Sequence, residues 1–139
     1  MNIIEANITA IKNAWKPWGR ATRSEFWWVT AVLFGSVVLA GIIDETLLAN
    51  VNHASEIYTV ATIAFIAVYV PWLILFVLTL VRRLHDMDMS GWYALLLLLG
   101  VIGLVVLGII CGRQGTLGPN RFGLDPRYTE IDEITDIFG

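Results

Sequence analysis

The sequence predicts an all-α integral membrane protein with three transmembrane helices and an N-terminal amphipathic helix in the membrane interface. Three apolar runs, 27–43, 58–81 and 92–111, contain no Asp, Glu, Lys, Arg or His. Hydrophobic residues make up 57% of the chain and charged residues 15%, which is more apolar than soluble domains usually are. Because a soluble helix needs one polar face, a chain of 139 residues has no way to hide three helices that are apolar on all sides.

The lengths of the runs fit membrane spans. They hold 17, 24 and 20 residues, and about 20 residues at a rise of about 1.5 Å each cross a hydrocarbon core of about 30 Å. The preceding segment, 1–26, is too long and too charged for the start of a cleavable signal peptide, so the first run is expected to remain as an anchor. The chain 1–139 is expected to form a single membrane domain.

The N-terminal segment has the pattern of an interfacial helix. Apolar residues recur at steps of three and four, which aligns them on one face of a helix: Ile4, Ile8, Ile11, Trp15 and Trp18. Charged residues lie largely off this face. Such a helix is expected to lie in the interface plane and to stop before Pro17.

The positions of the cations predict the orientation. Six of the nine Lys and Arg residues precede the first run or lie between the second and third, and none lies in the loop 44–57. The positive-inside rule therefore places the N-terminus in the cytoplasm. Three spans then put the tail 112–139, a Gly- and Pro-rich turn region followed by an acidic segment, outside. The alternative is a re-entrant hairpin around Gly100 and Gly103, which would return the tail to the cytoplasm.

Three groups of residues resemble the signatures of the DUF805 family. They are Gly-Arg-Ala-Thr-Arg-Ser-Glu-Phe-Trp at 19–27, Arg-Arg-Leu-His-Asp at 82–86 with Ser-Gly-Trp at 90–92, and Gly115, Gly118, Asn-Arg-Phe-Gly at 120–123 and Asp-Pro at 125–126. The resemblance covers about 15–127 and implies a small bacterial inner-membrane protein with few spans and no established activity. Pro17 and Asp88 depart from the family pattern, which usually has an aromatic residue and a glycine there.

Residues of these motifs are candidates for binding a lipid headgroup or a membrane partner: Arg20, Arg23, Arg82, Arg83, His85, Asp86 and Arg121. The predicted topology brings the first two motifs together at the cytoplasmic surface, where arginine groups match phosphate oxygens. In the alternative interpretation the cations are topology anchors that pair with Glu25, Asp86 and Asp88. Arg121 is expected to pair with Asp125 or with a helix-end carbonyl.

The absence of ionisable residues from the runs favours a binding protein over a channel or transporter. A non-enzymatic membrane protein that binds lipid or a partner is the main hypothesis. No ionisable residue lies within a run, so an ion path through one protomer lacks its usual residues. The alternative is an oligomeric channel or small transporter that uses a kink at Pro71 and a polar seam of Ser36, Thr59, Thr62 and Thr79.

Neither a metal nor a cofactor is expected from the sequence. His85, Asp86 and Asp88 are close together, but the other histidine, His53, is predicted across the membrane. A lipid-modifying enzyme that combines these three with Glu25 is a third alternative, without a recognisable nucleophile and base pair. The expected partners are the phospholipid bilayer, through anionic headgroups, and a second copy or another membrane protein; no nucleic acid is expected.

Overall fold

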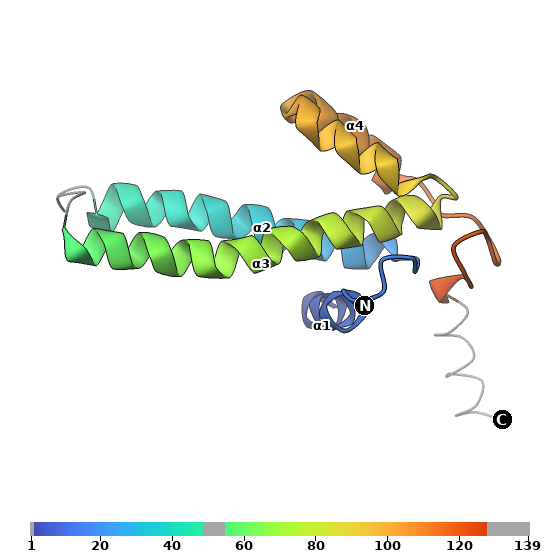
Figure 1. Ribbon diagram of the computed structural model, residues 1–139, viewed down its shortest axis with the longest axis horizontal. Helices are drawn as coiled ribbons and strands as arrows, with labels where there is room; N and C mark the ends of the chain where they lie inside the picture. Colours follow the sequence, from blue (N-terminus) through green and yellow to red (C-terminus); the bar gives the residue numbers. More distant parts are fainter. Residues whose placement is uncertain (1, 49–54, 128–139) are drawn as a thin grey trace.

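The computed structural model describes residues 2–48 and 55–127. Apart from one isolated bridge between Asn120 and Gly123, the regular structure in these ranges is helical, which confirms the all-α fold class. In chain order the elements are α1 (Ile3–Asn13), α2 (Arg23–Ile43) with a π-helical end η1 (Asp44–Leu48), α3 (Glu56–Asp86), the 3₁₀ helix η2 (Gly91–Leu99) and α4 (Val101–Gly112) (Figure 1). His53 lies outside the described residues, and so does the predicted acidic segment that follows Arg127.

Helices α2 and α3 form a long antiparallel pair (Figure 1). The stretches Arg23–Thr46 and Glu56–Asp86 are each long and apolar enough to cross a membrane. In the most apolar part of each, however, only 17% and 22% of the residues are buried within the protein. Helices apolar on all sides with so little burial fit a lipid environment rather than a soluble core. The predicted spans 27–43 and 58–81 lie within these helices, and α3 continues through Pro71.

The third apolar run is not one helix. Gly100 separates η2 from α4 with φ 61° and ψ −132°, a conformation that glycine adopts far more readily than other residues. Beyond this bend the two segments pack closely, since a Cβ atom on Gly103 would lie 1.7 Å from the carbonyl oxygen of Leu96. The prediction of a continuous helix over 92–111 is therefore wrong, and a third span is not confirmed.

The bend returns the chain to the end of the molecule where α3 ends. The Thr116 amide donates to the Asp86 carbonyl at 2.9 Å, and the Asn120 side chain donates to the His85 carbonyl at 2.8 Å. The 12 residues of α4 extend about 18 Å, less than a hydrocarbon core of about 30 Å. The described part of the tail thus lies beside the end of α3, as the hairpin alternative predicts, and not at the opposite end, as three spans require.

Helix α1 crosses the α2–α3 pair and packs against it (Figure 1). A reciprocal capping box between Asn2 and Glu5 fixes its start. Ala6 and Ala10 are buried, because their small side chains allow the helices to approach closely. The larger apolar side chains of α1 remain exposed: Ile3, Ile4, Ile8 and Ile11. The predicted amphipathic helix is present, and it ends at Asn13.

Candidate functional site

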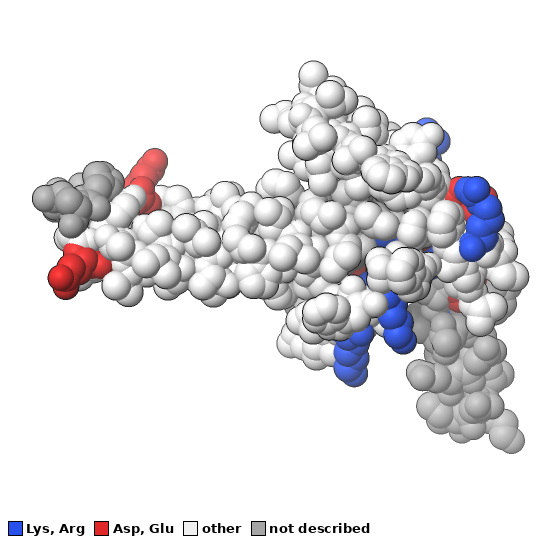
Figure 2. Space-filling model, viewed as in Figure 1, with Lys and Arg blue, Asp and Glu red and all other residues white. Residues whose placement is uncertain are grey.

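Lys and Arg side chains gather toward one end of the α2–α3 pair, and the visible charged side chains at the opposite end are acidic (Figure 2). The chain's nine Lys and Arg residues all belong to segments that meet where α2 begins and α3 ends, which we call the cationic end. At the opposite end the described charged residues are the acids Asp44, Glu45 and Glu56. This separation is the pattern expected when one end faces the cytoplasm.

Asp86, the last residue of α3, is the centre of a buried ion-pair network. Its Oδ1 atom accepts a hydrogen bond from Arg20 Nε at 2.8 Å, and its Oδ2 atom accepts one from Arg83 Nη1. All three residues are buried. Gly115 passes directly beside the carboxylate, because a Cβ atom there would lie 1.8 Å from Asp86 Oδ2. The absence of a side chain at 115 lets the tail cover the network.

The remaining donors of Arg20 hold the tail. They reach the carbonyl oxygens of Thr116 at 2.5 Å and Gly118 at 2.6 Å. A guanidinium group carries five N–H donors in a rigid fork, so one side chain serves several acceptors. Arg20 therefore joins the segment before α2 to the tail while it neutralises Asp86.

Arg83 joins three other parts of the backbone. Its guanidinium donates to the carbonyls of Cys111 at 3.0 Å, Ala21 at 3.5 Å and Arg113. The first and third of these acceptors belong to the end of α4, and the second lies just before α2. Arg83 thus fixes the base of the η2–α4 hairpin against the start of α2.

Arg82 and Glu25 form a second buried ion pair, between α3 and the first turn of α2. Arg82 Nη1 lies 2.8 Å from Glu25 Oε1, and Arg82 Nη2 donates to the Arg20 carbonyl at 3.2 Å. Thr22 caps α2 by accepting from the Glu25 amide at 3.2 Å. We call Arg20, Glu25, Arg82, Arg83 and Asp86, with the tail segment they hold, the junction.

His85 makes an aromatic contact at the edge of the junction. Its ring stacks on Phe122 with centroids 3.9 Å apart and planes 4° from parallel. Gly91 leaves room for the imidazole, since a Cβ atom there would lie 3.3 Å from His85 Nε2. The stack attaches the tail to the last turn of α3.

Two further ion pairs lie within the turn region. Arg121 Nε donates to Asp88 Oδ1 at 2.9 Å, and the Arg121 side chain is 67% exposed. Arg121 Nη2 donates to the Asp88 carbonyl, two residues after α3 ends, at 2.6 Å, so Arg121 contacts a carbonyl near the helix end and does not pair with Asp125. Asp125 is buried and accepts from the Gly118 amide and from Arg127. Burial acts to raise the pKa of Asp125, but the hydrogen bonds and charge of Arg127 outweigh it and hold that pKa below its ordinary value.

Most of the predicted site residues are used inside the protein. The buried candidates are Arg20, Arg82, Arg83, His85 and Asp86, and the exposed candidates are Arg23 and Arg121. Removing one partner from a buried ion pair costs about 3–5 kcal/mol, so a phosphate would have to overcome a large penalty to displace Asp86 or Glu25. A ligand of the cationic end is thus expected to contact the exposed cations.

Three exposed cations of this end were not among the candidate site residues: Lys12, Lys16 and Arg113. They lie outside the three motifs, and a charge in a sequence does not reveal whether its neighbours bury it. The one available signal was the position of the two lysines in and after a predicted interfacial helix. Across residues 2–48 and 55–127, no three His, Cys, Asp or Glu side chains are grouped so as to hold a metal ion.

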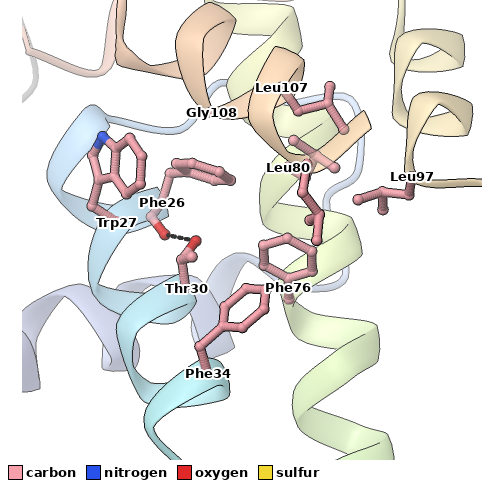
Figure 3. Close-up of a pocket in the computed structure, with 10 residues that line it drawn as sticks. Phe26, Trp27, Thr30, Phe34, Phe76, Leu80, Leu97, Leu107 and Gly108 are labelled. Carbon is pink, nitrogen blue, oxygen red and sulfur yellow. Dashed lines mark hydrogen bonds between the residues drawn. The ribbon is translucent and has the colours of Figure 1, made fainter. Parts of the chain in front are cut away.

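An apolar cavity of about 160 Å³ lies beside the junction, between α2, α3 and the η2–α4 hairpin (Figure 3). Phe26 and Trp27 of α2, Phe76 and Leu80 of α3 and Leu107 of α4 are among the residues that line it. The cavity is half open to the surroundings. It therefore lies within the apolar part of the molecule, next to the cations of the junction.

Comparison with known proteins places these features in a family. Residues 14–124 match the family described as "Protein of unknown function (DUF805)". The chain is 37% identical over 109 residues to the inner membrane protein YhaH of Escherichia coli (strain K12), with 78% of this chain and 85% of YhaH covered. It is 34% identical over 123 residues to the inner membrane protein YhaI of the same strain, with 87% and 94% covered. No solved structure shows a significant match.

Proposed function

We propose that this chain, a small membrane protein that belongs to the DUF805 family, is a non-enzymatic protein that binds anionic phospholipid headgroups at its cationic end. The observation that carries this proposal is the gathering of all nine Lys and Arg residues at one end of the α2–α3 pair, whose other end carries acids. The positive-inside rule would place this end, with the N-terminus, at the cytoplasmic leaflet of the inner membrane. That leaflet has a negative surface potential.

The exposed cations are the proposed contacts to lipid. Lys12, Lys16, Arg23 and Arg113 are exposed, and none of them forms an ion pair with a described acid. Each Lys or Arg near an anionic membrane surface contributes about 1 kcal/mol. Together they would favour an anionic headgroup over a zwitterionic one.

The geometry of α1 supports the same surface. The helix crosses the α2–α3 pair (Figure 1), so it would lie in the membrane plane when the pair spans the bilayer. Its isoleucines are exposed, and Trp15 and Trp18 after it are 91% and 76% exposed. Tryptophan rings favour the headgroup level, which would bring Lys12 and Lys16 to the phosphates.

The buried candidates have a different role in this proposal. Arg20, Arg82, Arg83 and Asp86 hold the start of α2, the end of α3 and the tail together. Because this framework is internally paired, it would keep the exposed cations in a fixed arrangement. The charged motifs would then serve lipid binding as a scaffold.

The other functions considered gain no support from the side-chain contacts. The hydroxyl groups of Ser36, Thr59 and Thr62 donate to the backbone carbonyls of Leu33, Ser55 and Tyr58, so these three groups do not form a polar seam between helices. The Thr79 hydroxyl is buried and has no hydrogen-bond partner among the described residues. Glu25 and Asp86, which a lipid-modifying enzyme would need, are already paired with arginines.

The test is the lipid composition around the protein in nanodiscs that contain phosphatidylglycerol and phosphatidylethanolamine. We expect the wild type to enrich phosphatidylglycerol. Lys12→Gln/Lys16→Gln/Arg23→Gln should lower its relative affinity by about a hundredfold, since about 1 kcal/mol is lost for each of the three charges. Lys12→Arg/Lys16→Arg/Arg23→Lys keeps the charges and should keep the enrichment. Equal enrichment in wild type and the Gln variant would overturn the proposal.

A further inference from the structure

We propose that the apolar cavity between α2, α3 and the η2–α4 hairpin binds one acyl chain of an anionic phospholipid, whose phosphate lies between Arg23 and Arg113. This inference rests on the proposed function, because it assigns a specific site to one of the lipids that the cationic end attracts. Two features support it: the shape and chemistry of the cavity, and the two exposed arginines at the junction ends of the helices that line it.

The walls of the cavity suit a hydrocarbon chain. Its floor consists of buried aromatic and aliphatic side chains: Phe26, Phe76, Leu80 and Leu107. Its rim carries Trp27 and Phe34, which are 45% and 44% exposed. The edge-on packing of Phe34 on Phe76, with centroids 6.3 Å apart, continues this apolar surface along α2. A chain that enters from the bilayer would therefore meet apolar groups throughout.

Water is a poor occupant of the same space. The one hydroxyl group in the lining belongs to Thr30, and it already donates to the Phe26 carbonyl at 2.7 Å (Figure 3). A stable buried water needs two to four polar partners, which the lining does not offer. Lipid chains, by contrast, surround a membrane protein on all sides, and filling the space restores the contacts that an empty cavity loses.

Glycine keeps the cavity open on the α4 side. A Cβ atom on Gly108 would lie 3.9 Å from Trp27 Cη2, so the indole lies over a position of α4 that has no side chain. A large side chain at 108 would project toward the indole and occupy part of the cavity. The residue therefore offers a direct way to close the site.

Arg83 joins the two helix ends nearest the cavity on the junction side. Its guanidinium holds the carbonyls of both Ala21 and Arg113, which brings the start of α2 and the end of α4 together. Arg23 is the first residue of α2 and lies one turn before Trp27, on the same face. Arg23 and Arg113 are exposed and lie beyond the cavity lining, at the junction ends of α2 and α4. From there their guanidinium groups would complement a phosphate attached to a hydrocarbon chain.

The experiment uses the full chain in nanodiscs with phosphatidylglycerol that carries a diazirine on one acyl chain. After photolysis, we expect labelled peptides to map to the cavity residues of α2 and α4. Gly108→Leu should lower this labelling by at least tenfold. Gly41→Leu is the matched control, because a Cβ atom at 41 meets nothing within 4 Å, and it should label as the wild type does. If Gly108→Leu fails to fold, Thr30→Leu narrows the cavity from α2; it removes only the hydroxyl that donates to the Phe26 carbonyl.

The outcomes separate the inference from the proposed function. Labelling spread over the outer faces of α2 and α3, or unchanged by Gly108→Leu and Thr30→Leu, would overturn the cavity site even if phosphatidylglycerol is still enriched around the protein. Equal cavity labelling by a phosphatidylethanolamine diazirine, unaffected by Arg23→Gln/Arg113→Gln, would overturn the assignment of an anionic lipid. Labelling confined to the cavity, stronger for phosphatidylglycerol and reduced by both kinds of variant, would support the inference.

Discussion

The two halves of the α2–α3 pair are held by opposite kinds of contact. No residue of α2 after Leu33 and none of α3 before Leu75 is buried, so the half far from the junction exposes its apolar side chains. In the half at the junction, the buried residues include Glu25, Asp86, Arg82 and Arg83, and Arg20 is buried just before α2. Charges lie inside at one end, and apolar groups lie outside at the other.

This contrast shows where the shape of the protein is specified. Lipid tails are as apolar as leucine, so burial of apolar surface gives little preference for one helix arrangement over another in a bilayer. Hydrogen-bonded ion pairs are directional, and each buried donor left without an acceptor is costly. We therefore expect substitutions at the junction to have large effects and similar substitutions elsewhere to have small ones.

The largest effect is expected from Asp86→Ala. It leaves Arg20 and Arg83 buried without their shared carboxylate, and we expect a loss of about 3–5 kcal/mol in the free energy of unfolding. SDS titration in mixed micelles measures this quantity. Glu45→Ala, at the exposed far end, is the control and should stay within about 0.5 kcal/mol of wild type. An equal loss of free energy of unfolding in both variants would show that the junction does not stabilise the protein more than the far half does.

A smaller effect is expected from Gly103→Ala in the hairpin. The added methyl group would overlap the Leu96 carbonyl at 1.7 Å, so η2 and α4 must separate, at a cost of about 1–3 kcal/mol. Hydrogen exchange at the amides of 113–127 should rise as the hairpin loosens. Gly112→Ala, in the same helix but with nothing within 4 Å of the new Cβ atom, should leave exchange unchanged. The same exchange in both variants would argue against tight packing of the hairpin.

The turn region should loosen at low pH through Asp125. Its pKa is below its ordinary value in the folded protein, so its stabilising contribution is fully present above the unfolded pKa of about 3.9 and is lost as the pH falls through the folded pKa. NMR titration of the Gly118 amide, which donates to Asp125 at 3.2 Å, should show this transition. Asp125→Asn should abolish the transition; its persistence would assign the titration to another group.

The smallest effect is expected from Arg121→Gln. Arg121 Nε lies 2.9 Å from Asp88 Oδ1, about as close as the atoms of the buried ion pairs. Both side chains are exposed, however, and exposed pairs contribute about 0–1 kcal/mol. The free energy of unfolding should therefore fall by less than a third of the loss in Asp86→Ala. A comparable loss would mean that pairing itself, and not burial, stabilises the cationic end.

The sequence predicted several parts of the fold correctly. The runs 27–43 and 58–81 are local properties of length and polarity, and both lie in continuous helices. The repeat of apolar residues before Pro17 is also a local property, and it correctly predicted the amphipathic helix α1.

The site was predicted only in part. The motif residues do meet at one end, and the pairing of arginines with Glu25, Asp86 and Asp88 was among the alternatives. Which cations are exposed was not predictable, because the burial of Arg20 depends on carbonyls at 116 and 118. Contacts between residues nearly a hundred positions apart leave no mark on local sequence pattern.

By itself, the sequence predicted that the protein belongs in a membrane, that three apolar runs are long enough to cross it, and that the cations are kept away from the loop between the first two runs. These follow from apolar length and charge, which add up along the chain. Only the tertiary structure decided that the third run bends at Gly100 and that the tail lies beside Asp86. A single glycine permits that bend without requiring it, and Arg20 and Arg83 stabilise the bent form because they bind backbone carbonyls that only the folded chain brings within reach.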